Sequence, residues 1–535
     1  MLGQKRVGVL IDTISIQRYI FSTNNLKENV GASHLVKKIY EDFLEEVVKD
    51  LFSDSINIDE WRQSPENIKI LEDSTPFEVG YIGGGNALLF FREEDKAREF
   101  IKKWSLKLLI KSPGIIPAFA VGEIDFGNFS KSLQNLFKTL LKNKTEFLPE
   151  VIIKRHGITA ECPNTGYSAE VWCDQEGEFI SSVSYAKINA AKDALNELIN
   201  KDEIKRLLKD SYTFTFKIDK LGQRENEDSH IAIVHIDGND MGDRIRRIDN
   251  LVDLRKFSKS LKEATEKAFN EILKKIIERI ENGDLEKAGI YLQPEEDGHR
   301  TILPLRPIII GGDDITFVSE GRLGIWLAKI FLEEFQRQEV SDGKGLTACA
   351  GVAITKTKYP FYRGYILSEE LTKSAKEARK SRNNSGSWID FHIAYGGFSE
   401  GIKEIRESQF RTSDGKSVIM RPYRIEDFDK LLEGVAHFKN TFPRSKVMEL
   451  RQVIYSSEVD RTLFMERLKV RGLKLPEYNP SYWEKEQKKE NENLFIKQAE
   501  TQMETTPYFD MIELMDFYPE FAIESKSKGG KDDQL

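Results

Sequence analysis

The order of apolar and polar positions along the chain repeats itself once. In the first copy, apolar runs at 7–12, 81–90 and 117–124 are separated by helix-like stretches at 17–52 and 94–110. Short apolar runs bounded by turn residues are typical of buried strands, and apolar residues three and four positions apart are typical of helices. The predicted order is therefore strand, helix, two strands around a glycine turn, helix and strand.

A second copy of this order follows in the middle of the chain. Its elements are expected at 231–237, 308–317, 323–338 and 347–354. In the first copy, 73 positions separate Asp12, at the end of the first strand, from Gly85 in the glycine turn. In the second copy, 76 positions separate Asp237 from Asp313. Because both the order and the spacing agree, we interpret the two segments as an internal repeat.

Each copy predicts a ferredoxin-like domain, an antiparallel sheet with helices on one face. The second copy is expected to close with a helix at 368–382 and a strand at 387–392. A further helix is expected at 186–209, between the copies. The segment 250–280 has the apolar spacing of one amphipathic helix. The predicted fold class is therefore α+β.

The same pattern divides the chain into five parts. We expect two ferredoxin-like domains at 1–129 and 230–398, joined by a linker domain with helices and a knuckle at 130–229. A helical C-terminal domain is expected at 399–523. The last residues, 524–535, are small and polar, which is typical of a disordered tail.

Composition narrows the class of protein. The chain has 535 residues, of which 39% are hydrophobic and 31% charged, with a net charge of −8. This composition excludes a disordered, collagen-like or disulfide-scaffold protein. The apolar runs are too short for a membrane helix and the N-terminus has no signal-peptide pattern, so we expect a cytoplasmic protein with no membrane partner. The acidic balance argues against coating nucleic acid through bulk charge.

Three carboxylates are predicted to meet at one edge of the second sheet. Asp237 ends a buried strand, and Asp313 and Asp314 lie in the glycine turn. Because the first strand and the central hairpin are neighbours in this fold, their ends face the same way. Close carboxylates repel one another and bind cations, and oxygen ligands without nearby His or Cys select Mg²⁺ or Mn²⁺. Two such ions form a clamp for an in-line attack on a phosphate.

Glycines around these acids suit a nucleotide site. Gly311 and Gly312 allow a tight turn and close approach of a ligand to the backbone. Gly238, Asn239 and Gly242 follow the first strand, where backbone N–H groups and a helix N-terminus would hold a triphosphate. The alternative interpretation is two ordinary turns with acids that face the solvent.

The first copy lacks the key acids. Gly85 and Asn86 stand where the second copy has two aspartates, and only Asp12 remains. This copy is therefore expected to be a degenerate partner, which either helps to bind a second nucleotide or only packs against the second copy.

These motifs resemble the large, polymerase-like subunit of type III CRISPR effector complexes, a family with two palm domains related to nucleotidyl cyclases and GGDEF diguanylate cyclases. The Gly-Gly-Asp-Asp at 311–314 is similar to the hairpin of the family's second palm, and the Asp-Gly at 237–238 to its strand-end motif. The run at 15–33 resembles its first palm. The helical pattern at 400–523 fits its C-terminal domain.

The resemblance implies a nucleotidyltransferase that makes cyclic oligoadenylates from ATP in antiviral defence. Asp237 and Asp313 would hold the metals, and Asp314 would support them or orient the attacking 3′-hydroxyl. Lys376 or Lys380, on the helix after the third strand, would neutralise the triphosphate, or both would lie on a solvated helix face. Catalysis of this kind depends mainly on positioning and charge neutralisation.

The chain departs from the family pattern at two points. It starts directly with the first palm and no His is followed by Asp, so we expect no HD nuclease activity from it. The family often has a four-cysteine zinc module between the palms. Here Cys162 begins a remnant with Thr165 in place of a second cysteine, and only Cys173 and His156 are near in sequence. Zinc sites usually have four ligands, so we expect no zinc.

Several functions remain open at this point. The chain would work either in an RNA-guided complex, with guide or target RNA and other effector subunits, or as a stand-alone synthase. A different class is a non-catalytic scaffold that binds RNA and partner subunits, against which the retained acids argue. A third alternative is a GTP-using diguanylate cyclase.

Overall fold

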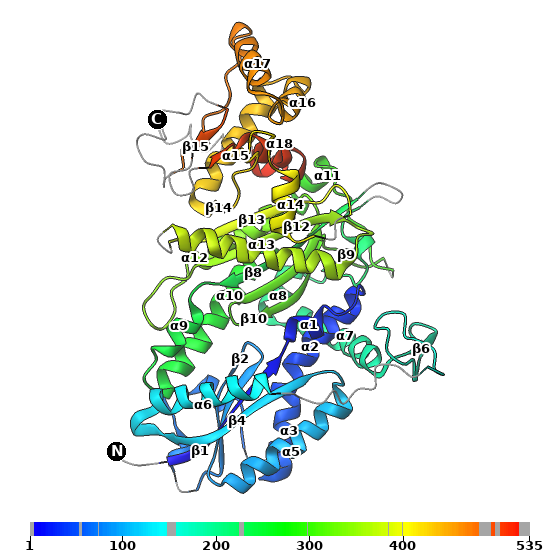
Figure 1. Ribbon diagram of the computed structural model, residues 1–535. Helices are drawn as coiled ribbons and strands as arrows, with labels where there is room; N and C mark the ends of the chain where they lie inside the picture. Colours follow the sequence, from blue (N-terminus) through cyan, green and yellow to red (C-terminus); the bar gives the residue numbers. More distant parts are fainter. Residues whose placement is uncertain are drawn as a thin grey trace.

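The computed structural model describes the residues in the following ranges: 5–52, 56–72, 74–146, 157–223, 229–296, 298–382, 385–397, 400–480, 494–497 and 503–523. Figure 1 shows the first copy of the repeat at the bottom, the second copy in the middle and the C-terminal helices at the top. The predicted disordered tail at 524–535 lies outside the described residues.

The first sheet has the predicted ferredoxin-like order, β2-β3-β1-β4, with every pair antiparallel. Its strands are β1 (Lys5–Ile14), β2 (Phe77–Gly83), β3 (Asn86–Phe91) and β4 (Ile116–Asp125). The central strand β1 carries Val9, Leu10 and Ile11, which are fully buried. These apolar runs were the basis of the strand prediction, which is confirmed.

Helices surround this sheet. They are α1 (Ile16–Ile20), α2 (Leu26–Tyr40), α3 (Asp42–Leu51), α5 (Glu94–Lys111) and α6 (Phe129–Thr145). The predicted helical stretch at 17–52 is thus three helices. The first two are separated because Asn25 caps α2, where its side chain accepts hydrogen bonds from the backbone N–H groups of Lys27 and Glu28.

The second sheet has six strands in the order β10-β11-β8-β12-β13-β14. They are β8 (His230–Gly238), β10 (Leu305–Gly311), β11 (Asp314–Glu320), β12 (Ala348–Lys356), β13 (Trp388–Ile393) and β14 (Tyr423–Arg424). β12 and β13 are parallel and the other pairs are antiparallel. All residues from Ile231 to Ile236 are buried, as expected for a strand covered on both faces.

The first sheet is covered on both faces, since Gly122 of β4 faces Leu136 of α6, whereas Phe119 points to the other face and packs against Trp104 of α5. The second sheet is also covered on both faces, so the expectation of helices on one face is wrong for both domains. The helices are α10 (Leu251–Glu281), α12 (Gly324–Gln336) and α13 (Phe361–Ser381). A methyl group on Gly351 of β12 would overlap the backbone of α13, whereas its neighbour Val352 faces Gly324 of α12. Successive residues of a strand point to opposite faces, so α12 and α13 lie on opposite sides.

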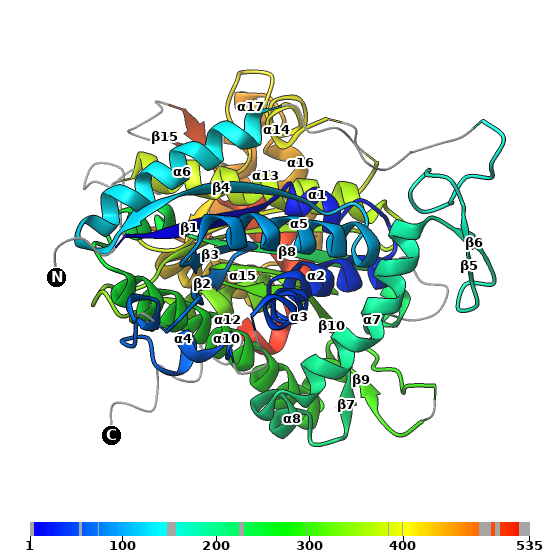
Figure 2. The same ribbon diagram turned by 90° about the horizontal axis from the view of Figure 1, so that it is seen from below.

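The segment between the two domains forms a small hairpin and two helices. The hairpin is β5 (Val171–Cys173) and β6 (Glu178–Ile180), and it projects from the molecule beside α7 (Figure 2). The predicted helix at 186–209 is two helices, α7 (Ser182–Asn200) and α8 (Asp202–Leu208). They are separated at Lys201, whose backbone is extended.

The C-terminal region is helical, as predicted. Its helices are α14 (Ile402–Gln409), α15 (Ile425–Thr441), α16 (Arg444–Val453), α17 (Glu458–Val470) and α18 (Tyr508–Phe517). The side chain of Arg421 is fully buried beneath α18, where it forms an ion pair with Glu513, with Nη1 and Oε2 2.7 Å apart. The charged segment at 484–493 lies outside the described residues.

Shorter elements connect these parts. They are α4 (Glu60–Gln63), α9 (Met241–Arg246), α11 (Asp284–Lys287), β7 (Tyr212–Thr213) paired with β9 (Thr301–Ile302), and β15 (Ile496–Lys497) paired with β16 (Glu504–Thr505). Among the described residues, no helix is both long enough and apolar enough to cross a membrane.

Candidate active site

The three predicted acids lie together at one edge of the second sheet. Asp237, near the end of β8, lies directly opposite Asp314, the first residue of β11. Asp313 occupies the turn between β10 and β11, and its carbonyl oxygen accepts a hydrogen bond from the N–H of Gly238 at 3.0 Å. This hydrogen bond fixes the turn over the end of β8. The register of the sheet therefore positions all three side chains.

Two glycines are required by this geometry. Gly312 has a φ of +59°, the left-handed conformation that the tight turn needs. A Cβ on Gly238 would lie 2.6 Å from the Cβ of Asp313, so a larger residue would push the turn away from β8. Gly311 pairs with Asp314 and closes the hairpin. Gly311 and Gly312 also line the cavity described below.

The acids of the turn are strongly perturbed. Burial raises the pKa of Asp313 to about 7, and the neighbouring carboxylates of Asp237 and Asp314 contribute. Burial raises the pKa of Asp314 well above its ordinary value, with Asp237 and Glu369 contributing. The site thus concentrates negative charge that is only partly compensated, which is the environment that binds a cation.

Lys376 of α13 provides part of the compensation. Its Nζ donates to Asp237 Oδ2 at 2.5 Å and to the carbonyl oxygen of Gly238 at 3.1 Å. One turn further along the helix, Arg379 is buried and forms two hydrogen bonds with Asp240, at 2.6 and 3.3 Å. Lys380, the other predicted cation, is exposed. Lys376 therefore reaches the acids and Lys380 has no contact with them.

The other predicted residues hold the loop after β8. Asn239 is buried, and its N–H and Nδ2 donate to the carbonyl oxygen and Oγ1 of Thr347 at 2.9 and 3.1 Å. Gly242 lies in α9, a helix of six residues, and has open space around its Cα. Asn239 thus fixes the loop to Thr347, and Gly242 has no side chain that would cover the loop.

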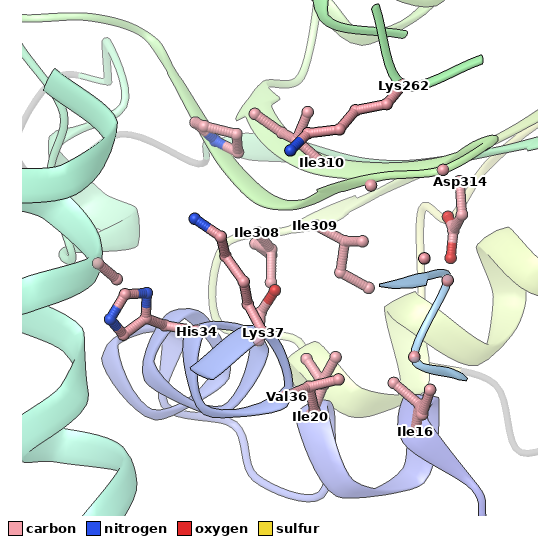
Figure 3. Close-up of a pocket in the computed structure, with 18 of the residues that line it drawn as sticks. Ile16, Ile20, His34, Val36, Lys37, Lys262, Ile308, Ile309, Ile310 and Asp314 are labelled. Atoms are coloured by element: carbon pink, nitrogen blue, oxygen red, sulfur yellow. The ribbon is translucent and has the colours of Figure 1, made fainter. Parts of the chain in front are cut away.

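A cavity of about 550 Å³ joins the two repeat copies in front of the acids. It is lined by Ile16 and Gln17 of the first copy and by the glycine turns of both copies. In Figure 3, Asp314 lies on one side of the cavity, and Lys37 and Lys262 extend into it from opposite walls. Burial lowers the pKa of Lys262. The far end of the cavity thus has mixed charge, because Glu41 and Glu197 also line it and both form ion pairs with Lys37.

Comparison with known families identifies the domain that carries these acids. Residues 230–385 match the family model for the second palm domain of Cas10/Cmr2. This part of the chain is similar to a Cas10/Cmr2 second palm domain. The region includes Asp237, the Gly-Gly-Asp-Asp turn and Lys376, so the suspected resemblance is confirmed for the part of the chain that holds the site. A search of the curated proteins finds no match.

Solved structures of Csm1 share the fold of nearly the whole chain. A Csm1–Csm4 cassette in complex with cA4 superposes with a TM-score of 0.55 at 14% identity, over 96% of this chain and 70% of that chain. The cassette with one ATP gives 0.54 at 12% identity, with the same coverage. Csm1 in T. onnurineus gives 0.54 at 14% identity, again with the same coverage. At these identities the likeness shows the fold, which comprises two palm domains and a helical C-terminal region.

The first palm repeats the geometry of the second. Asp12 lies opposite Asn86, just as Asp237 lies opposite Asp314. The N–H of Thr13 donates to the carbonyl oxygen of Gly85 at 3.0 Å. Lys144 of α6 forms an ion pair with Asp12. The first palm thus keeps the strand-end acid and its lysine, and lacks both acids of the turn.

The sequence prediction missed two further residues that lie beside these acids. Glu369 of α13 lines the cavity, and its negative charge helps to raise the pKa of Asp314. It lies seven residues before Lys376, so both side chains project from one helix face, a signal present in the sequence. Gln17 Nε2 of the first palm donates to Asp314 Oδ2 at 3.2 Å. Nothing in the pattern of the first copy indicates that this residue reaches the second.

The carboxylates of Asp237, Asp313 and Asp314 are suitable ligands for a divalent cation, provided that Asp237 leaves its hydrogen bond with Lys376. Asp314 Oδ1 is buried and accepts no hydrogen bond among the described residues, and His235 Nδ1 lies 3.4 Å away. Carboxylates in such surroundings favour Mg²⁺ or Mn²⁺ over Zn²⁺. As placed, however, no three His, Cys, Asp or Glu side chains in the described ranges are gathered to hold a metal ion. Oδ2 of Asp237 accepts a hydrogen bond from Lys376 instead.

The predicted knuckle remnant before α7 is a pair of matching turns. The N–H of Gly166 donates to the carbonyl oxygen of Cys162, and that of Gly177 to the carbonyl oxygen of Cys173, both at 2.8 Å. Both cysteines are buried in one small apolar cluster. The side-chain hydroxyl of Ser184 helps to lower the pKa of Cys162 to about 7 although burial opposes this.

Each of these two turns has one cysteine and, just before its glycine, a different residue where a four-cysteine site would need a second thiol. Thr165 precedes the glycine of the first turn, and its hydroxyl lies 3.0 Å from that of Ser181. Glu176 precedes the glycine of the second turn and pairs with Lys27 at 3.3 Å. His156 lies outside the described residues. The second turn was not recognised in the sequence, although its Cys-x-x-x-Gly spacing was visible there.

Proposed function

We propose that this chain is a metal-dependent nucleotidyltransferase that joins ATP into cyclic oligoadenylates, in an antiviral system of the type III CRISPR kind. The observation that carries the proposal is the position of Asp237, Asp313 and Asp314. They meet at one sheet edge of a Cas10/Cmr2 second palm and face a cavity shared with the first palm. Mg²⁺ or Mn²⁺ ions, when bound there, would polarise the reacting phosphate and neutralise the leaving group.

The residues of the chain would position the two reactants. In each cycle, the 3′-hydroxyl of one nucleotide attacks the α-phosphorus of another, the bond to pyrophosphate breaks, and the hydroxyl proton is lost. Asp237 and Asp313 would hold the metals, and Asp314 would orient the attacking hydroxyl. Gly311 and Gly312 leave room for the donor triphosphate against the backbone.

Lys376 would change partners during this cycle. In the absence of a ligand its ammonium pairs with Asp237. With Asp237 engaged in holding a metal, Lys376 would be free to pair with the phosphates of the nucleotide. The cations at the other end of the cavity, Lys37 and Lys262, would attract the phosphates of the second nucleotide.

The similar structures support this assignment through their ligands. Csm1–Csm4 cassettes have been solved with ATP, with pppApA and with cA4, a substrate, a linear intermediate and a cyclic product of such a reaction. The same structures support an effector partner related to Csm4. Guide or target RNA would be a further partner in such a complex.

Product analysis tests the proposal. Purified protein is incubated with ATP and Mg²⁺ or Mn²⁺, alone and with its effector partners and target RNA, and products are identified by mass spectrometry. We expect a cyclic oligoadenylate that disappears in the Asp313→Ala/Asp314→Ala variant. Asp12→Ala, which changes the equivalent acid of the first palm, is the matched control and should retain product. Normal synthesis by the double variant, with unchanged thermal stability, would overturn the assignment of the site.

A second candidate function is a non-catalytic scaffold that binds RNA and partner subunits. It is favoured by one observation, the ion pair with Lys376 that keeps Asp237 from the other acids. The two candidates differ in metal binding. A catalytic site must bind Mn²⁺ through Asp313 and Asp314, whereas a scaffold retains assembly with RNA and partners when both acids are replaced and makes no product under any activation.

A further inference from the structure

The hairpin formed by β5 and β6 carries an unusual pair of exposed aromatic side chains. Trp172 and Phe179 lie directly opposite each other in the hairpin, with ring centroids 5.2 Å apart in an edge-to-face arrangement. They are 50% and 56% exposed. No other Trp or Phe of the described residues is classed as exposed. Trp and Phe side chains are thus exposed as a contacting pair at this hairpin alone among the described residues.

One face of this hairpin is buried and the other is exposed. Cys173 and Ile180 point inward and join Cys162 and Ile188 in a small buried cluster. Side chains alternate between the faces of a strand, so the aromatic pair occupies the opposite face. The core of the knuckle is thus complete without these two rings. Both ribbon views show the hairpin projecting from the molecule beyond α7, away from the palm domains (Figures 1 and 2).

The charge around the aromatic pair has one sign. Residues 157–186 contain five acidic side chains and no Lys or Arg, although Lys and Arg make up 80 of the 535 residues of the chain. Asp174 lies beside the pair, where its Oδ1 accepts a hydrogen bond from Trp172 Nε1 at 2.8 Å. Glu178 is exposed next to Phe179. The pair is therefore bordered by carboxylates.

We propose that this surface, Trp172 and Phe179 with Asp174 and Glu178, is a docking site for an arginine- or lysine-rich segment of a partner protein. Aromatic faces attract guanidinium and ammonium groups, and the flanking carboxylates add ion pairs. Exposed Trp is among the residues that contribute most at protein interfaces. The acidic border repels the phosphates of nucleic acid, which would otherwise stack on such rings. This site is separate from the palm cavity and does not depend on its activity.

A binding experiment with the full chain tests this proposal. The probe is a fluorescein-labelled twelve-residue peptide of alternating Arg and Gly, followed by fluorescence anisotropy at low and at physiological salt. We expect saturable binding that weakens about tenfold in Trp172→Ala/Phe179→Ala, because both the ring contacts and the water-excluding surface are lost. Asp174→Lys/Glu178→Lys should weaken binding at least as much, and it leaves the aromatic pair and thus the hairpin intact.

Matched variants exclude bulk charge and misfolding as explanations. Glu407→Lys/Glu433→Lys makes the same change of net charge on exposed acids of α14 and α15 and should leave the Kd within twofold. Thermal unfolding of all three variants should match the unaltered chain. The proposal is overturned if the peptide does not bind, or if it binds all variants equally. It is also overturned if labelled oligouridylate binds through the aromatic pair, or if light scattering shows a dimer that the hairpin variants dissociate.

Discussion

The ammonium of Lys376 lies 2.5 Å from Oδ2 of Asp237. The first palm contains the same relationship, because Lys144 of α6 pairs with Asp12. In both palms the acid lies towards the end of the first strand, and the lysine comes from the helix that follows the fourth strand of the repeat, β4 or β12. The pair is therefore a shared part of the repeat. In the second palm it neutralises one acid that the proposed metals would require.

Replacement of this lysine should separate its two roles. In Lys376→Met, Asp237 loses its partner and becomes free for a cation. We expect Mn²⁺ to bind the nucleotide-free protein about fivefold more tightly, which corresponds to the modest value of a partly exposed ion pair. We expect the KM for ATP to rise, because the phosphates lose a neutralising charge. Electron paramagnetic resonance of Mn²⁺ measures the first quantity and product assays measure the second.

Lys144→Met is the control for this experiment. It breaks the equivalent pair in the first palm, which involves none of the three acids, and should leave Mn²⁺ affinity unchanged. Weaker Mn²⁺ binding in Lys376→Met than in the unaltered chain would mean that the lysine helps to build the metal site and does not compete for it.

The acids of the turn should make the metal-free protein less stable at high pH. Burial, with Asp237 and Asp314 nearby, raises the pKa of Asp313 to about 7, whereas in the unfolded chain it ionises near its ordinary value of 3.8. Between these two values the folded state binds more protons, so stability falls as pH rises from about 4 to about 7. Asp313→Asn removes this loss and should stabilise the metal-free protein by about 1–2 kcal/mol at pH 8, after allowance for screening in an open cavity.

Urea unfolding at pH 5 and pH 8 measures this effect. At pH 5 the difference should be smaller than at pH 8 but already present, because Asp313 is protonated in the folded state and largely ionised in the unfolded chain. Added Mn²⁺ should stabilise the unaltered chain at pH 8 and have less effect on the variant. Equal stabilities at pH 8 without metal would show that Asp313 is solvated well enough to ionise freely.

The sequence predicted the repeat and the meeting of the three acids because both depend on local information. Period-2 apolar runs define the strands, and the ferredoxin-like order then determines which strand ends are neighbours. Asp237 and Asp314 face each other for this reason alone. The contact of Gln17 with Asp314 depends on how the two palms pack together, which no local pattern records.

The side of the second sheet on which α13 packs could not be predicted from local sequence patterns either. The helix at 368–382 was predicted, and the structure begins it at Phe361 on the face opposite α12. Two glycines carry this information: Gly351 allows α13 to approach one face of the sheet at β12, and Gly324 allows α12 to approach the other face, where Ala232 of β8 is its nearest neighbour. A glycine within a strand was visible in the sequence, but which helix it admits was not.

This close approach makes Gly351 a sensitive position. A methyl group there would overlap the carbonyl oxygen of Ser368 and the N–H of Thr372 in α13. Because these contacts are backbone atoms, the helix must move as a whole, and Lys376 moves with it. We expect Gly351→Ala to destabilise the fold by about 2–3 kcal/mol and to weaken ATP binding. Gly345→Ala, where no atom lies within 4 Å of the added methyl, is the control for thermal unfolding and ATP titration.

The knuckle should recover a zinc site when two residues are changed. The turns that begin at Cys162 and Cys173 have the same backbone hydrogen bond, and both sulfurs lie in one cluster. Thr165→Cys/Glu176→Cys would place a second thiol in each turn and supply the four ligands that zinc requires. We expect one zinc ion per chain and a rise in melting temperature that a chelator reverses, measured by metal analysis and thermal unfolding. Either single variant, with three thiols, should bind zinc more weakly. Absence of zinc in the double variant would show that the two turns are not oriented towards a common centre.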